Sequence, residues 1–364
     1  MSQEIVAVAK REKNPKRNYL VLNRLQAKHV PGSPRTALAY FGCLADVVGR
    51  AYAGEKLLLI GFAETATGIG SALAIKLKTA YMQTTREEVE GAEFLYFTEA
   101  HSHATEQRLV RADLERALDK IDRIVFVEDE LTTGNTVSHI VSLIRKTFLK
   151  RVNFAAASLV NGMSEEAKEN FVKEGIDLCF LEAVDYSDFP KKAEQARVDG
   201  EYFPAHTGES SEGICCWEAL GGQNARRLVN GEDYGHSCED LWKQFLEANG
   251  RICGKRLLVL GTEELMYPAL YLGSRLEEEN QVLCHGTTRS PILVSRAPED
   301  LLHRRFSLVS LYERERRTFV YNLEACDQAI VITDAPSPCR EGLNSLFWAL
   351  KRCGSRKIQL VRWC

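Results

Sequence analysis

The chain has 364 residues, of which 45% are hydrophobic and 27% charged, a globular composition with room for two domains that each bury a core. Its net charge of -3 gives no electrostatic reason to bind nucleic acid or an anionic membrane as a general partner. No apolar stretch approaches the roughly 18 residues of a membrane span, and no signal-like region follows the N-terminal charges. We therefore predict a cytoplasmic protein whose phosphate binding, if any, is local.

Strands and helices are predicted to alternate from about Lys56 to Glu182, which is typical of a doubly wound parallel sheet. From Ser187 to Gly235 the pattern lapses into a segment rich in Gly and charge, and it resumes from Arg256 to Trp363. We predict a first domain at 1–186, a linker or an excursion over the first site at 187–237, and a second α/β domain at 238–364. The strands predicted in the first domain are Leu57–Gly61, Ala80–Gln83, Phe94–Phe97, Ile124–Val127 and Phe154–Leu159.

The N-terminal segment is basic around Lys28 and His29, which either reach a phosphate or are solvated charges. The eleven cysteines have no C-x-x-C spacing, and only Cys215 and Cys216 are adjacent. Reduced and mostly buried thiols are therefore expected.

The loop Gly61–Gly70 follows the first strong strand and opens a helix. Its small residues and hydroxyls suit an anionic group. A dinucleotide fingerprint fails here at the third glycine, and no G-x-x-x-x-G-K-S/T motif occurs. We therefore predict that this loop meets an anionic group of a ligand.

Cationic candidates follow between Gln83 and Arg123. Arg86 is a plausible phosphate or pyrophosphate ligand, with a surface ion pair as the alternative. His101 and His103 could neutralise or protonate a departing pyrophosphate, bind a metal, or belong to a solvated loop.

The most informative segment is Arg123–Thr136. Ile124–Val127 is a continuous apolar run, which predicts a strand covered on both faces. Glu128 and Asp129 follow at its carboxyl end, where open α/β sheets bind ligands, and can hold vicinal ribose hydroxyls. A hydroxyl-rich turn then leads into a helix from about Val137, so that backbone N–H groups can wrap a phosphate. The alternative is an ordinary strand followed by a capped helix. The predicted phosphate cradle is Thr132, Thr133, Gly134, Asn135 and Thr136.

The two halves resemble each other. Lys56–Glu64 matches Arg256–Glu264, Thr84–Arg86 recurs as Thr287–Arg289, and Ile124–Asp129 aligns with Ile330–Asp334. This indicates a duplication, although Leu/Val-rich strands can also match by chance. In the second copy Thr333 replaces one carboxylate and Ala335–Pro338 replaces most of the loop, so the loss of two N–H donors predicts a lost phosphate cradle.

These motifs resemble a known pairing of domains. The first half is similar to the type I, orotate-phosphoribosyltransferase-like domain that stands before a TRSP domain in tellurium-resistance and stress gene clusters, and Thr288–Pro291 spells the Thr-Arg-Ser-Pro motif. The resemblance implies transfer of phosphoribose from phosphoribosyl diphosphate (PRPP) to a nucleobase-like heterocycle, with Mg2+ held mainly through the substrate, and a homodimer. It places the ribose hydroxyls on Glu128 and Asp129 and the 5-phosphate on Thr132 to Thr136. It places the pyrophosphate on Ala63, Glu64, Thr65, Ala66 and Thr67. The lysine-rich lid signature of orotate enzymes is absent, so orotate is doubtful as the acceptor.

Thr288, Arg289 and Ser290, with Glu264 on the neighbouring loop, form a second candidate site. This cleft could receive the ribosylated product or form a domain interface. Three functions remain open: a transferase using Glu128, Asp129, Arg86 and the two histidines; a non-catalytic PRPP-binding regulatory module; and a protein whose chemistry resides in the second domain.

Overall fold

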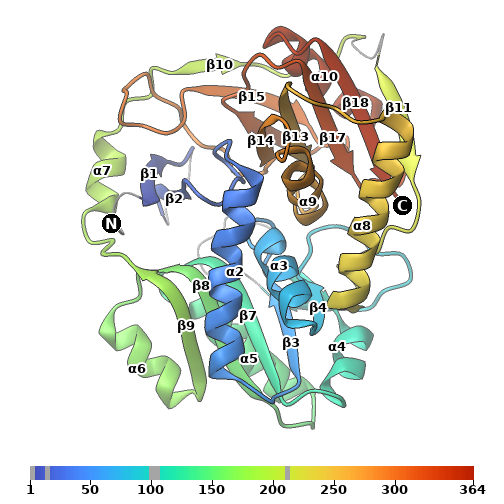
Figure 1. Cartoon of the computed structure of the whole chain (residues 1–364). Helices are drawn as coiled ribbons and strands as arrows, with labels where there is room; N and C mark the ends of the chain where they lie inside the picture. Colours follow the sequence, from blue (N-terminus) through green and yellow to red (C-terminus); the bar gives the residue numbers. More distant parts are fainter. Residues whose placement is uncertain (1–4, 13–16, 98–106, 210–213) are drawn as a thin grey trace.

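The computed structural model describes residues 5–12, 17–97, 107–209 and 214–364. Two mainly parallel sheets lie at opposite ends of the molecule, with helices between them (Figure 1). The elements of the first part are β1 (Val6–Lys10), β2 (Tyr19–Asn23), α2 (Pro34–Ala51), β3 (Leu57–Gly61), α3 (Thr67–Leu77), β4 (Ala80–Gln83), β5 (Phe94–Phe97), β6 (Gln107–Val110), α4 (Arg111–Leu118), β7 (Arg123–Leu131), α5 (Asn135–Thr147), β8 (Asn153–Asn161), α6 (Glu165–Lys173), β9 (Ile176–Ala183) and α7 (Phe189–Gln195). Those of the second part are β10 (Glu201–Phe203), β11 (Cys215–Ala219), β12 (Val229–Asn230), α8 (Gly231–Asn249), β13 (Arg256–Gly261), α9 (Tyr267–Leu276), β14 (Gln281–Gly286), β15 (Arg304–Val309), β16 (Arg317–Tyr321), β17 (Gln328–Thr333), α10 (Arg340–Arg352) and β18 (Lys357–Trp363).

The first sheet has the strand order β12-β4-β3-β7-β8-β9 and is parallel except for β12. All of β3 and the first five residues of β7 are buried. Such continuous burial is expected of central strands that are covered on both faces. The predicted strands Leu57–Gly61 and Ala80–Gln83 are confirmed with the same bounds, and two others extend further than predicted.

Phe94–Phe97 is a strand, but it does not join this sheet. It pairs antiparallel with β6 as a separate hairpin. Its side chains alternate between buried and exposed, and Tyr96 is 51% exposed. A strand with one face in water is typical of antiparallel pairing, so the prediction that it belongs to the doubly wound sheet was wrong.

The second sheet repeats the topology of the first. Its order is β11-β18-β17-β13-β14, all parallel, so that β14-β13-β17-β18 corresponds to β4-β3-β7-β8. The registers agree as well, because Gly61 pairs with Val127 and Gly261 pairs with Ile332. Asp334, two residues after Ile332, is therefore the counterpart of Asp129. The predicted class of two α/β domains with a duplicated sheet is confirmed.

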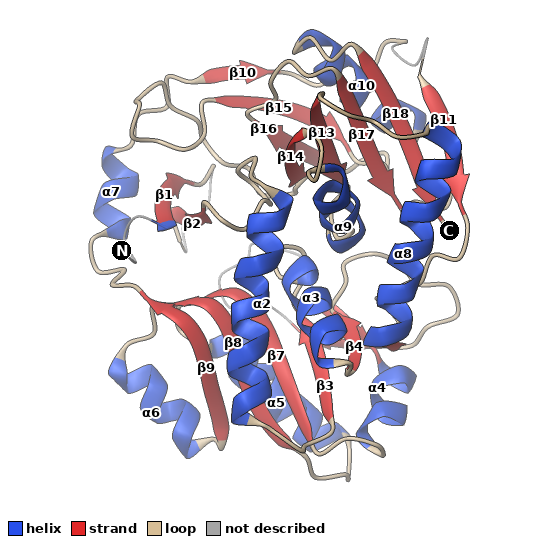
Figure 2. Cartoon of the chain, viewed as in Figure 1, coloured by secondary structure: helices blue, strands red, loops and turns tan. Residues whose placement is uncertain are grey.

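One core lies between the two sheets. Figure 2 shows α2, α3, α8 and α9 in this layer, and their apolar faces form a single cluster with residues of both sheets. The outer face of the first sheet packs against α4 and α5, and that of the second against α10 and β15-β16. Helices α2 and α3 pack on the first sheet and α8 and α9 on the second, so the two halves meet helix against helix within this layer.

The halves also exchange sheet edges. Val229–Asn230, just before α8, pairs antiparallel with β4, while Gly32, just before α2, bridges Cys284 of β14. Residues 187–237 are accordingly more than a linker, since they supply α7 and strands to three sheets: β10 to β15, β11 to β18 and β12 to β4. The predicted domain limits stay a prediction.

All eleven cysteines are free. The prediction that most of them are buried was wrong, because four are fully buried and five are exposed, Cys215 and Cys216 among the latter. Both of those lie on β11, an edge strand of the second sheet, where side chains reach solvent. Within the described ranges no helix has the length and apolarity to cross a membrane.

Candidate functional site

The two loops predicted to bind ligand come together at the carboxyl ends of β3 and β7, which are neighbours in the first sheet. The hydroxyl of Thr65 donates to Asp129 Oδ1 at 2.8 Å. Glu128 and Asp129 are half-buried, as is Thr65. Asp129 and the predicted pyrophosphate loop thus meet at the edge where open α/β sheets bind ligands.

Asp129 has an unusual acidity for a strand-end carboxylate. Burial, followed by the charge of Glu130, raises the pKa of Asp129 to about 6, while the hydrogen bond from Thr65 acts in the opposite direction. Asp129 is therefore close to changing its charge near neutral pH. Perturbed acidity of this kind is a common property of functional carboxylates.

The hydroxyl-rich loop has the geometry of an anion cradle. Helix α5 begins at Asn135, and its N-cap Gly134 has φ of 73° and provides no side-chain cap. Thr133 Oγ1 lies 3.4 Å from the N–H of Asn135. Glycine is required because a Cβ at position 134 would lie 2.4 Å from the Phe171 ring. The helix dipole and N–H groups at this end favour a phosphate.

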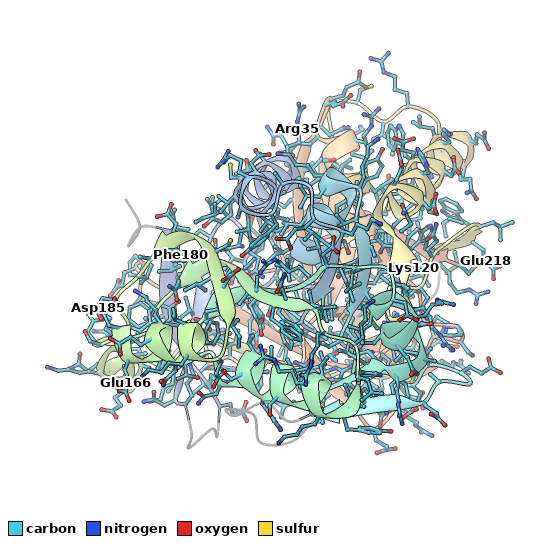
Figure 3. The ribbon with its side chains drawn as sticks, turned by 90° about the horizontal axis from the view of Figure 1, so that it is seen from below. Arg35, Lys120, Glu166, Phe180, Asp185 and Glu218 are labelled. Atoms are coloured by element: carbon cyan, nitrogen blue, oxygen red, sulfur yellow. The ribbon has the colours of Figure 1, made fainter. Side chains whose placement is uncertain are left out.

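Beside this loop lies a groove of about 610 Å³. It lies between the start of α5 and helix α6, and Glu166 of α6, which is labelled in Figure 3, is one of its lining residues. The predicted cradle residues that line it are Thr132, Thr133 and Asn135. The loop is therefore open to a ligand from this side.

The pyrophosphate loop is held rigidly through its backbone. The N–H of Ala63 donates to Thr84 Oγ1 and its carbonyl accepts from Gln107 Nε2, both at 2.8 Å. Gln26 Nε2 donates to the carbonyl of Thr65 at 2.8 Å. Ala66 is the N-cap of α3 and provides no side-chain cap, and Thr67 is the first buried residue of that helix. Sequence reasoning missed both glutamines, because a single amide side chain in a hairpin or turn carries no motif.

Glu64, also predicted as a pyrophosphate ligand, points instead to the second domain. It is 5% exposed, and its carboxylate accepts from the hydroxyl of Thr288 and, at 3.1 Å, from the N–H of Arg289. Lys28 Nζ lies 3.9 Å from Glu64 Oε1. Although burial acts to raise it, the positive charges of Lys28 and Arg289 hold the pKa of Glu64 below its usual value.

The reverse contact is made by Glu264, the counterpart of Glu64. Its carboxylate accepts from the hydroxyl of Thr85 at 2.7 Å and from the N–H of Arg86 at 2.8 Å. Arg226 Nε donates to it at 3.0 Å. We call these two reciprocal contacts the Glu64 clasp and the Glu264 clasp. Of the residues predicted for a second-domain site, Thr288, Arg289 and Glu264 lie in the clasps, and the N–H of Ser290 donates to Thr288 Oγ1 at 3.1 Å.

Other predicted cations have structural surroundings. Lys28 is buried and donates to the carbonyls of Glu263 and Thr287 at 2.6 and 3.0 Å, so it is not a solvated charge. His29 is also buried, and burial lowers its pKa to about 4. Arg86 lines a cleft between the domains together with Asp334. His101 and His103 lie outside the described residues.

Sequence reasoning did not find Arg226, although it completes the Glu264 clasp and its Nη1 donates to Asp334. The match between Thr84–Arg86 and Thr287–Arg289 was the available signal. It showed that both copies keep the same residues, but not that each copy uses them to bind the other.

The chemistry of the first site is that of oxygen donors. In the part of the chain that the structure describes, no three His, Cys, Asp or Glu side chains gather as a metal cluster. Asp129 and the hydroxyl of Thr65 nevertheless provide hard oxygen donors in contact with each other. Such donors suit Mg2+ that is held chiefly by substrate oxygens.

Comparison with known proteins assigns a family model to each half of the chain. Residues 5–178 match the model of a phosphoribosyl transferase family, and residues 234–349 match that of the TRSP domain, C-terminal to this transferase. No curated protein sequence matches the chain.

Several solved structures are similar to half of the chain. They include adenine phosphoribosyltransferase from Rhodothermus marinus, at 11% identity over 50% of this chain and 96% of that one, with a TM-score of 0.37. Orotate phosphoribosyltransferase from Aeropyrum pernix has 17% identity over 49% and 85%, with a TM-score of 0.30. Adenine phosphoribosyl transferase from Trypanosoma brucei, in complex with AMP, pyrophosphate and ribose-5-phosphate, has 13% identity over 50% and 77%, with a TM-score of 0.35. On its two family matches, the chain belongs to the proteins in which a phosphoribosyl transferase domain is followed by a TRSP domain.

Proposed function

We propose that the protein transfers phosphoribose from PRPP to a nucleobase-like heterocycle and releases pyrophosphate. The observation that carries this proposal is the hydrogen bond between Thr65 and Asp129, because it brings the two predicted ligand loops to one place at the sheet edge. A donor molecule spanning both loops would have its 5-phosphate at Gly134 and its pyrophosphate at Thr65, with the ribose between them.

Each part of the first site has its own role in the proposed reaction. The N–H groups at the start of α5 hold the 5-phosphate, and the hydroxyls of Thr132 and Thr133 surround it. Glu128 and Asp129 accept hydrogen bonds from the ribose hydroxyls. As the bond from C1 to pyrophosphate breaks, positive charge grows on the ribose, and the two carboxylates stabilise it. Positioning and charge complementarity, rather than covalent catalysis, supply most of the acceleration.

Mg2+ would be held by Glu128, Asp129 and the donor's oxygens, and when bound it makes pyrophosphate a better leaving group. The pyrophosphate loop itself stays fixed by Thr84, Gln107 and Gln26, so little reorganisation accompanies the reaction.

The acceptor class is a heterocycle with a nucleophilic ring nitrogen. We further propose a cytoplasmic protein that acts in nucleotide-like or stress metabolism, as the tellurium-resistance setting of the resemblance implies. The proposed homodimer can be tested by size-exclusion chromatography with light scattering.

The test is calorimetric titration of PRPP with and without Mg2+, on the wild type and on Asp129→Asn. We expect Mg2+-dependent binding that the variant loses while staying folded. Pyrophosphate release with a panel of nucleobases then separates catalysis from a regulatory binding module, which would bind PRPP without turnover. An absence of PRPP binding by the wild type would rule out both.

A further inference from the structure

We propose that the cleft between the two domains is a second ligand site, which binds a phosphate-bearing small molecule. The cleft has a volume of about 570 Å³, within the range of small-molecule sites. Asp334 and Trp363, at the carboxyl ends of β17 and β18, contribute to its wall. Ligands of open parallel sheets bind at such strand ends.

The cleft occupies the same position on the second sheet as the first site occupies on the first sheet. The chain can be aligned without a gap from Asp129 to Asn135 and from Asp334 to Arg340. Each of the two helices that follow is 13 residues long. The cap positions differ, because Gly134 has φ of 73° whereas Cys339 has φ of -59°.

Because of this difference the second sheet lacks a backbone phosphate cradle, but the ligand position at its strand ends remains. Pro336 and Pro338 have no N–H to give to an anion. Donors come instead from side chains, because five arginines line the cleft: Arg86, Arg108, Arg226, Arg316 and Arg362. The first two belong to the first domain, so the site is complete only when both domains are in place. Guanidinium groups bind phosphate in fork geometry.

Two of these arginines have hydrogen-bonding capacity to spare. Arg226 is 5% exposed and is fixed by Glu264 and Asp334, yet its Nη2 has no hydrogen-bond partner among the described residues. Arg108 Nε is likewise buried and unpartnered within those ranges. A buried donor without a partner is costly unless something accepts from it. A phosphate oxygen would do so.

The acidic side chains of the cleft do not prevent this. Asp334 already accepts from Arg226 and from the Tyr312 hydroxyl. Glu87 is paired with Arg289 and Arg316. Glu88 and Glu313 are 81% and 57% exposed in their side chains, so both can turn to solvent when an anion enters.

The test uses equilibrium dialysis of the full chain with labelled ribose 5-phosphate. We expect two equivalents to bind to the wild type. Arg226→Lys keeps the charge but removes the fork, and Arg362→Gln removes a charge on β18 of the second sheet. Each should weaken the binding of one equivalent roughly tenfold or more. Arg314→Gln is the matched control, because Arg314 is 71% exposed and does not line the cleft.

Asp129→Asn, which is expected to stay folded, identifies the other equivalent. If the wild type binds one equivalent and that one is lost in Asp129→Asn, the second site is refuted while the proposed function stands. The second site is also refuted if both cleft variants fold and keep two equivalents, or if the wild type binds none. If only the equivalent that depends on Asp129 is missing, the cleft is supported and the proposed function is not.

Discussion

The carboxylate of Glu64 accepts a hydrogen bond from the hydroxyl of Thr288 across the boundary between the two domains. Glu264 accepts from Thr85 in the opposite direction, so the two copies hold each other by the same chemistry. Because Glu64 directly precedes Thr65, the Thr-Arg-Ser-Pro segment of the second domain fixes the loop that hydrogen-bonds to Asp129. The second domain is thus a structural part of the first site.

Glu64→Gln should destabilise the protein strongly. It leaves Lys28 buried without its carboxylate, and breaking one partner of a buried ion pair costs roughly 3–5 kcal/mol. The measurement is urea unfolding, followed by PRPP titration of the folded fraction.

Glu264→Gln is the matched control for that change. It removes the corresponding carboxylate, but Arg226 keeps Asp334 as a partner, so we expect a smaller loss of stability and PRPP affinity close to that of the wild type. Equal PRPP affinity in both variants would argue against a positioning role of the Glu64 clasp.

Asp129→Asn should abolish PRPP binding and leave the fold at least as stable as the wild type. The pKa of Asp129 is raised to about 6, chiefly by burial, so the native state holds its proton more tightly than the unfolded state does. The wild type therefore loses stability as pH rises from about 4 to 6, by at most about 3 kcal/mol in total. Thermal unfolding of both proteins should show that the variant is more stable than the wild type at pH 7.5 but not at pH 4.5.

The same carboxylate predicts how PRPP affinity depends on pH. Hydrogen-bond acceptance from ribose hydroxyls and attraction to a cation both need the ionised form, so PRPP should bind more tightly as pH rises from 5 to 7. Calorimetry across this interval is the check. Affinity that is flat or falls with pH would contradict the assigned role of Asp129.

Gly134→Ala should impair both folding and phosphate binding. The new Cβ would combine a left-handed φ with a 2.4 Å contact to Phe171. Gly54→Ala provides the control, because Gly54 has φ of 85° and nothing within 4 Å of the added Cβ. There we expect only the backbone strain, about 1 kcal/mol. Similar unfolding midpoints for the two variants would mean that the Phe171 contact relaxes easily.

His285→Leu should stabilise the protein most at acidic pH. His285 is fully buried on β14, both ring nitrogens lack a partner among the described residues, and burial lowers its pKa to about 3. Below about pH 6.5 the unfolded chain takes up a proton that the native state refuses, so stability is lost as pH falls, by about 2 kcal/mol at pH 5. Unfolding at pH 5 and 7.5 measures the difference, and the exposed His139 supplies the control for loss of a histidine.

The sequence predicted those parts of the fold that depend on local pattern. Leu57–Gly61 is apolar throughout and ends at a glycine, so both its type and its bounds followed. The association of Thr65 with Asp129 followed from a general rule about strand ends in parallel sheets. Phe94–Phe97 was assigned to the wrong sheet because its four residues fit a strand of either sheet. Which strand it pairs with, and which of its faces is buried, is decided by neighbouring elements that the local sequence does not reveal.

The clasps could not be predicted for a related reason. Glu64 and Glu264 occupy matching positions in the two copies, but the partner of each lies more than 170 residues away. Lys28 illustrates the limit, since a lysine is usually solvated and only the carbonyls of another domain make its burial tolerable.

The exchange of Val229–Asn230 and Gly32 has a consequence for the history of the chain. A protein with a single copy cannot cover the outer edge of its own second strand, because the covering segment comes from the other copy. Two such molecules, however, could cover each other. Fusing them into one polypeptide preserves that mutual protection and frees one copy to keep its hydroxyl-rich loop while the other changes, which is the asymmetry between Thr132–Thr136 and Ser337–Glu341.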